Sequence, residues 1–175
     1  MSGHRAVRLY QFKKKKYIFM KTLERHEIET NARILYYVVV GFKGKVGVEL
    51  SDLMWMEDWL NCSSFEPDEL KNGLYRLLKS GLICLKNGRL FRESKMEEFR
   101  IKSVHKKAGN WKKIEVIDKY LNQLYPLVLN GMINSKLRET CYEYIDDNFE
   151  LAQKQYHIEF KKIYGAKQKS KKDHV

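Results

Sequence analysis

Residues 66–91 read EPDELKNGLYRLLKSGLICLKNGRLF, and this stretch predicts a helix followed by a β-hairpin. Pro67 suits the first turn of a helix because its missing N–H would be unpaired there in any case, and the acidic residues after it complement the positive end of the helix dipole. Gly81 readily adopts the left-handed conformation that ends many helices. One apolar stripe at helical spacing lies between them, formed by Leu70, Leu74, Leu77 and Leu78. The spacing therefore predicts a helix from about Pro67 to Ser80.

The dipeptide Asn87-Gly88 predicts the hairpin, because a two-residue type I′ turn requires positive φ at both central residues. One strand precedes it at 82–85 and the other follows at 89–91. Away from its leucine stripe, the helix has a polar face of three cations, one amide and one phenol: Lys71, Asn72, Tyr75, Arg76 and Lys79. Such a face suits DNA.

Residues 28–42 (IETNARILYYVVVGF) predict an earlier helix, with Thr30 as its cap and Gly41 as its stop. The run from Ile34 to Val40 is apolar and rich in β-branched residues, so a buried strand that turns into a hairpin is the alternative. We prefer the helix, followed by a short strand at Val46–Val48.

Ser51 is the predicted N-cap of a helix from Asp52 to Leu60, and the polar linker at 61–65 leads to Pro67. The resulting order is helix, strand, helix, turn, helix and hairpin. This is the order of a winged-helix domain, whose second and third helices form the helix-turn-helix.

Residues from about 28 to 91 resemble the winged-helix domains of bacterial and phage DNA-binding proteins, above all in the segment LYRLLKSGLI at 74–83 and the short wing after it. The resemblance covers about a third of the chain and specifies fold better than function. It implies that the polar face of the helix enters or flanks the major groove, and that Lys86, Asn87 and Arg89 lie near phosphates or the minor groove. The turn at 61–66 is longer than the usual turn of about three or four residues. That length fits the looser domains of replication-initiation and replisome-organising proteins of phages and plasmids.

The 175-residue chain has a formal net charge of +12 and a pI near 9.5, which favours a polyanionic partner. The positive charge is concentrated in residues 1–25 (+7), 67–113 (+8) and 161–175 (+5), whereas residues 26–66 and 114–160 each have a charge of −4. We expect the two acidic blocks to form core helices or helices that face a partner.

Residues 1–25 are expected to form a basic arm, in which aromatic residues bracket four consecutive cations, Lys13, Lys14, Lys15 and Lys16. One interpretation is an arm that follows phosphates. The alternative is a solvated turn between two short strands whose aromatic rings pack on the core.

Beyond the wing, the pattern predicts a helix at 93–107, a helix at 111–129 that Pro126 kinks or ends, and a long helix at 135–164. The apolar spacing of the long helix is typical of an antiparallel helical pair or of a dimer seam. We therefore expect this region to pack on the winged helix, to mediate self-association, or both. Residues 165–175 are expected to be a disordered basic tail.

Sequence motifs give no candidate for catalysis, since the five histidines are scattered and no hydrolase, metalloprotease, P-loop or dinucleotide motif is present. Adjacent carboxylates, such as Glu57-Asp58 and Asp146-Asp147, point about 100° apart on a helix. We interpret them as solvated helix charges and expect no metal site and no cofactor.

The three cysteines, Cys62, Cys84 and Cys141, are too far apart for a zinc motif or a disulfide framework, so we expect a reducing compartment and interpret Cys84 and Cys141 as small core residues. We also find no signal peptide and no apolar run long enough to span a bilayer. These features predict a cytoplasmic protein without a membrane partner.

The expected fold is mainly α with a small β-hairpin wing, organised as an arm (1–25), a winged helix-turn-helix (26–92), an α-helical extension (93–164) and a tail (165–175). The expected function is non-enzymatic binding of double-stranded DNA, as a homodimer, in replication initiation or transcription regulation. Two alternatives remain: a phage-type inhibitor or adaptor that binds a host nucleoprotein complex, and an RNA-binding protein. The acidic residues at 49, 52, 57 and 58 would serve the adaptor.

Overall fold

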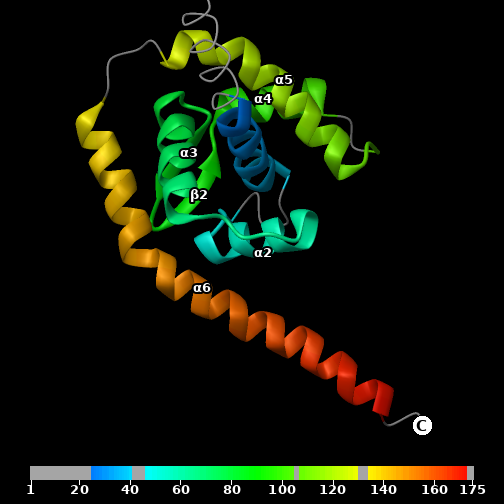
Figure 1. Ribbon diagram of the computed structural model, residues 1–175. Helices are drawn as coiled ribbons and strands as arrows, with labels where there is room; N and C mark the ends of the chain where they lie inside the picture. The colour runs from blue at the N-terminus through cyan, green and yellow to red at the C-terminus, as the bar shows by residue number, and fades with distance from the viewer. Residues whose placement is uncertain (1–24, 41–45, 105–106, 130–133, 173–175) are drawn as a thin grey trace, which may run out of the picture.

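The computed structural model describes residues 25–40, 46–104, 107–129 and 134–172. Over these residues the protein has six helices and one two-stranded antiparallel hairpin after α3, an arrangement consistent with a winged helix (Figure 1). The first helix covers residues 25–40 and is called the leading helix below. The other elements are α2 (Leu50–Asn61), α3 (Pro67–Lys79), β1 (Ile83–Lys86), β2 (Arg89–Arg92), α4 (Ser94–Ser103), α5 (Asn110–Leu129) and α6 (Ser135–Lys172).

The leading helix forms the centre of the core. Between Thr30 and Val39 every residue except Arg33 is buried. A helix that is apolar on all sides is stable when other elements surround it, so the β-branched run at 34–40 is helical, as preferred from the sequence. At its C-terminal end, Arg92 Nη1 donates a hydrogen bond to Val39 O at 2.9 Å and thereby satisfies a carbonyl that the helix itself leaves unpaired.

The start of α2 differs from the prediction. The N-cap is Glu49 and not Ser51, which is buried in the first turn. The Asp52 side chain accepts a hydrogen bond from Glu49 N at 3.0 Å, so an acidic residue three positions later satisfies the cap. The expected strand at 46–48 is reduced to a single bridge, in which Val48 and Leu90 exchange backbone hydrogen bonds of 2.8 Å.

The helix predicted from Pro67 and the hairpin predicted after it are confirmed. β1 and β2 pair around a two-residue turn, with Asn87 at φ 52° and Gly88 at φ 69°, the positive values that the turn requires. Gly81, at φ 65°, follows the end of α3 as predicted. Gly73 has a different role: a Cβ at this position would lie 2.6 Å from Ile34 Cδ1, so α3 approaches the leading helix closely because residue 73 has no side chain.

After the wing, α4 is shorter than the predicted helix at 93–107, and α5 continues past Pro126 to Leu129, so the proline does not end it. The rings of Phe99 and Tyr120 stack at 4.2 Å and join α4 to α5.

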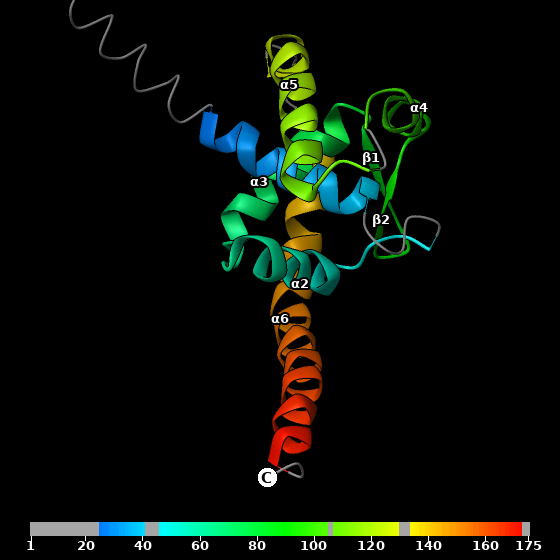
Figure 2. The ribbon, with the colours of Figure 1, turned by 90° about the vertical axis from the view of Figure 1, so that its right-hand side faces the viewer.

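Helix α6 runs along α3 and α2, and its C-terminal half projects away from the rest of the protein (Figures 1 and 2). It continues to Lys172, so the predicted helix end at 164 is wrong and the expected tail is helical as far as that residue. Its apolar stripe packs inside the same chain, where Cys141, Ile145 and Ala152 are buried. Packing on the winged-helix part is therefore confirmed, while self-association stays a prediction.

Candidate nucleic-acid interface

The polar face predicted on α3 is present, but it does not face solvent. Leu70, Leu74 and Leu77 are buried on the opposite side of the helix, as their spacing predicted. The five polar residues, Lys71, Asn72, Tyr75, Arg76 and Lys79, are all partly buried. Other elements of the chain therefore contact this face.

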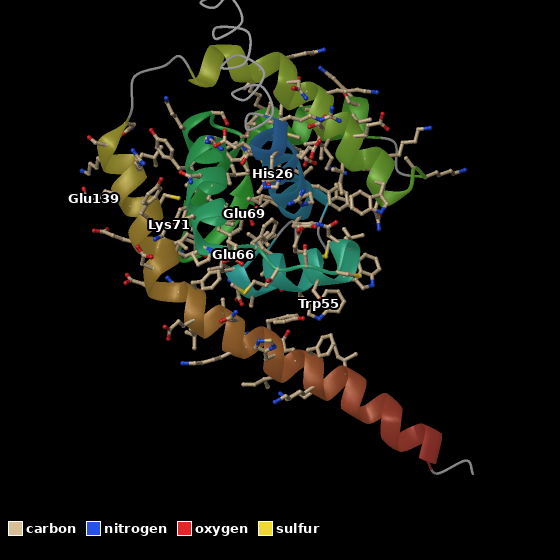
Figure 3. The ribbon with its side chains drawn as sticks, viewed as in Figure 1. His26, Trp55, Glu66, Glu69, Lys71 and Glu139 are labelled. Atoms are coloured by element: carbon tan, nitrogen blue, oxygen red, sulfur yellow. The ribbon has the colours of Figure 1, made fainter. Side chains whose placement is uncertain are left out.

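Helix α6 makes the contacts with the first turns of α3. Lys71 Nζ lies 2.6 Å from Asp146 Oδ1, and the side chain of Lys71 is only 17% exposed (Figure 3). Its hydrogen bond to Asp146 raises the pKa of Lys71 above its ordinary value. Beside this ion pair, Tyr142 Oη donates a hydrogen bond to Asn72 Oδ1 at 2.8 Å. Two of the predicted DNA contacts thus have partners on α6.

The next turns of α3 are also engaged. Tyr75 Oη accepts a hydrogen bond from Asn134 N at 3.1 Å, immediately before α6 begins. Arg76 Nη2 lies 2.6 Å from Glu27 Oε1 of the leading helix, and the Arg76 side chain is 17% exposed. The Arg76 guanidinium therefore joins α3 to the leading helix, a structural role that the sequence did not indicate.

The wing offers a more open surface. Lys86 and Asn87 are exposed at its tip. Arg89 instead forms an ion pair with Glu49 and donates to Val46 O at 3.1 Å, so it holds the wing to the start of α2. Tyr144 Oη of α6 donates to Gly88 O at 3.1 Å, and α6 thus contacts the wing as well as α3.

An apolar strip supports these polar contacts. Ile145 is fully buried and Cys141 is 1% exposed, with Cys141 Sγ 3.8 Å from Lys71 O. Burial raises the pKa of Cys141 to about 12. Burial, followed by the charge of Glu49, likewise raises the pKa of Tyr144 to about 12. The apolar part of the contact between α6 and α3 is therefore buried, whereas Asp146 at its edge is 61% exposed.

A line of carboxylates borders this contact. Residues 139, 143, 146 and 150 are acidic and follow one another at spacings of four, three and four, so they share one flank of α6. We call them the acidic stripe: Glu139, Glu143, Asp146 and Glu150. Glu139 lies near the start of α6 in Figure 3, and Asp146 is the member that reaches Lys71. The acidic block at 114–160 that the charge pattern singled out thus places part of its charge beside the most basic part of the fold.

Glu57 is buried, contrary to the prediction from the sequence. Glu57 was interpreted as a solvated charge and as part of an acidic partner-facing surface, but it is 1% exposed. Tyr37 Oη donates to Glu57 Oε2 at 2.6 Å, and Asn61 Nδ2 and Ser63 Oγ both donate to Glu57 Oε1 at 3.0 Å. Arg33 Nε lies 3.2 Å from the same carboxylate. Glu57 therefore ties the leading helix to α2 and its following turn.

A cavity of about 320 Å³ lies where the turn between α2 and α3 meets α6. Cys62, Phe65 and Met54 line it on one side, and Phe149, Gln153 and Tyr156 of α6 on the other. The long turn predicted at 61–66 thus contacts α6.

The predicted basic cluster Lys13–Lys16 lies outside the described residues. Within the residues that are described, no three His, Cys, Asp or Glu side chains are placed to hold a metal ion. None of the described helices is long and apolar enough to cross a membrane.

The partners of the polar face were missed because they come from other parts of the chain. Tyr142 and Asp146 lie about 70 residues after Asn72 and Lys71, and Glu27 precedes Arg76 by 49 residues. The opposite signs of the charge blocks were the available signal. Comparison of the chain with family models, with curated proteins and with solved structures finds no match.

Proposed function

We propose that the protein binds nucleic acid through a winged-helix unit, with α3 directed at the major groove of duplex DNA and the wing at the adjacent backbone. It acts in replication initiation or transcription control, without an enzymatic step. The observation that carries the proposal is that the polar face of α3 already binds an anionic group, since Lys71 holds the carboxylate of Asp146. Ammonium groups that pair with a carboxylate also pair with a phosphate oxygen.

The surrounding charge supports the same assignment. Residues 67–113, which contain α3 and the wing, have a net charge of +8. Lys86 and Asn87 are exposed at the wing tip, and α6 donates a hydrogen bond to the wing at Gly88. A cationic patch with an exposed hairpin tip suits contacts with the phosphate backbone.

Binding of the purified protein to mixed genomic DNA fragments, titrated with salt and followed by sequencing of the bound fraction, tests the proposal. We expect enrichment of one site, with affinity that falls steeply as salt rises. Excess structured RNA serves as the competitor, and preferential binding to RNA would reassign the substrate.

A pair of variants tests the wing. Lys86→Ala should weaken binding to all sequences and reduce the slope of log affinity against log salt by about 1. Lys119→Ala is the matched control, because this residue lies on α5 and pairs with Glu115 at 3.1 Å. If the two variants bind DNA with equal affinity, the wing is not part of the interface.

A second candidate function is the adaptor that binds a protein partner. The rings of Trp55 and Trp59 stack at 6.2 Å on α2, and Trp59 is 50% exposed. Exposed tryptophans are common anchors of protein interfaces. A partner that remains bound after nuclease treatment and high salt, and is lost in Trp59→Ala, would favour this function over DNA binding.

A further inference from the structure

We propose that the first half of α6 occupies the nucleic-acid-binding face of α3, so that α6 and nucleic acid compete for the same residues and the structure is the closed, inhibited state. This inference rests on the proposed function, and it concerns the regulation of that site. Three kinds of observation support it: the contacts, the charge and the way in which α6 is attached.

The contacts of α6 match those that a nucleic acid would use. A carboxylate of Asp146 lies on Lys71, in the place of a phosphate. The hydroxyl of Tyr142 donates a hydrogen bond to Asn72 Oδ1, and the backbone N–H of Asn134 donates one to Tyr75 Oη. Duplex DNA cannot reach these three side chains while α6 remains in place.

The charge of α6 adds to the steric effect. Its acidic stripe runs beside α3, on the flank that contains Asp146, and all four of its members are exposed. A phosphate backbone that approaches α3 would meet these carboxylates first. Like charges repel even where no direct contact forms, most strongly at low salt.

The attachment of α6 permits release. Its buried residues on the described interface include two small side chains, Cys141 and Ala152, and one large one, Ile145. The C-terminal half projects from the body (Figure 2), and within it Tyr156 still packs against the core. The other elements retain their own core around the leading helix, in which Leu74 and Tyr37 are fully buried. Release of α6 therefore leaves the central core in place.

Two charge reversals on α6 test the competition without changing α3. Asp146→Lys places a cation beside Lys71 and should open the contact. Asp147→Lys is the matched control: it makes the same change of charge one residue later, at an exposed position that points about 100° away on the helix. We expect Asp146→Lys to bind duplex DNA at least tenfold more tightly than Asp147→Lys. Equal affinities, within threefold, would overturn the proposal.

A covalent lock gives the opposite test. Cys62 is exposed and lines the cavity opposite Gln153 of α6, so Gln153→Cys allows a short bismaleimide to join the two across the cavity. Cys84 is replaced by serine both in the protein that is cross-linked and in the one that is left uncross-linked. In the Asp146→Lys background the cross-linked protein should lose its gain in affinity, and the uncross-linked protein should keep it. Retention of the gain after cross-linking contradicts the proposal.

The wild-type protein supplies a readout that depends on no variant. Cys141 lies on the side of α6 that contacts α3 and is 1% exposed, whereas Cys62 is exposed. Saturating DNA should therefore accelerate the alkylation of Cys141 by iodoacetamide severalfold and leave the Cys62 rate unchanged. If Asp146→Lys fails to fold, as judged by circular dichroism, this measurement decides the question, and an unchanged Cys141 rate counts against opening.

The failures are distinguishable. If neither wild type nor Asp146→Lys binds DNA or RNA, the proposed function is wrong and the inhibition falls with it. A different set of results would contradict the inhibition alone. In that case the protein binds DNA and Lys86→Ala lowers the affinity, but Asp146→Lys and Asp147→Lys have equal affinities and the alkylation rate of Cys141 does not change.

Discussion

Replacing Glu57 by glutamine should lower the stability of the whole fold, although the two side chains have nearly the same shape. The carboxylate is 1% exposed and receives hydrogen bonds from Tyr37, Asn61 and Ser63, with Arg33 alongside. Burial, together with the neighbouring carboxylate, raises the pKa of Tyr37 well above its ordinary range, so the phenol is protonated and donates at neutral pH.

The magnitude follows from what glutamine cannot do. Its single oxygen can still accept from Tyr37, but its amide presents two hydrogens to Asn61 and Ser63, where the carboxylate presented an acceptor. The Arg33 guanidinium, 14% exposed, loses its counter-charge. A hydrogen bond to a charged group contributes about 1.5–3 kcal/mol, and removal of one member of a buried ion pair costs about 3–5 kcal/mol. Because part of the network survives, we expect a loss of about 2–4 kcal/mol.

Urea unfolding followed by circular dichroism measures this loss. The control is Glu98→Gln, since Glu98 is 69% exposed and pairs with Lys102 on the surface. We expect the control to lose less than about 0.5 kcal/mol. A loss below about 0.5 kcal/mol for Glu57→Gln, with an unchanged dependence of unfolding on urea, would refute the reasoning and show that the buried charge is not required.

Three further predictions concern packing and thiol chemistry. Gly73→Ala should lower the free energy of unfolding by about 1–3 kcal/mol in the same assay, because the new Cβ would lie 2.6 Å from Ile34 Cδ1 and 2.8 Å from Asn31 Oδ1. A neutral result would show that the two helices separate easily. Asn31→Leu should raise stability by about 1–2 kcal/mol, since the buried Asn31 amide has no hydrogen-bond partner within the described structure; a loss of stability would mean that the amide is paired in solution. At pH 8, without nucleic acid, iodoacetamide should label Cys62 fast and Cys141 slowly, because burial raises the pKa of the Cys141 thiol to about 12 and leaves little thiolate. Similar labelling rates by mass spectrometry would contradict the burial of Cys141.

Local rules predicted the elements whose conformation depends on a few adjacent residues. The Asn87-Gly88 turn is one case, because positive φ is inexpensive for these two residue types wherever the chain places them. The cap of α2 shows the limit of such rules. Serine is the more common N-cap, yet the helix begins two residues earlier than predicted, where the Asp52 carboxylate accepts a hydrogen bond from Glu49 N and Arg89 holds Glu49.

These local rules could not predict features that depend on contacts between residues far apart in the sequence. The β-branched run at 34–40 suits a strand or a helix equally well, and burial by the surrounding elements decides for the helix. Glu57 looked like one of two adjacent surface charges. Its burial depends on Arg33 and Tyr37, which the fold brings to it from another helix.

Helix periodicity, turn chemistry and net charge depend only on neighbouring residues, and they were enough to predict where α3 and the wing lie, the polar face of α3 and the opposite charges of successive blocks. Tertiary structure alone decided what covers that face. The apolar stripe of α6 could pair with a second chain or with its own domain, and its spacing is the same in both cases. Only the packed fold brings Asp146 to Lys71, across 75 residues of chain, and so turns an expected contact surface for DNA into one that is already occupied.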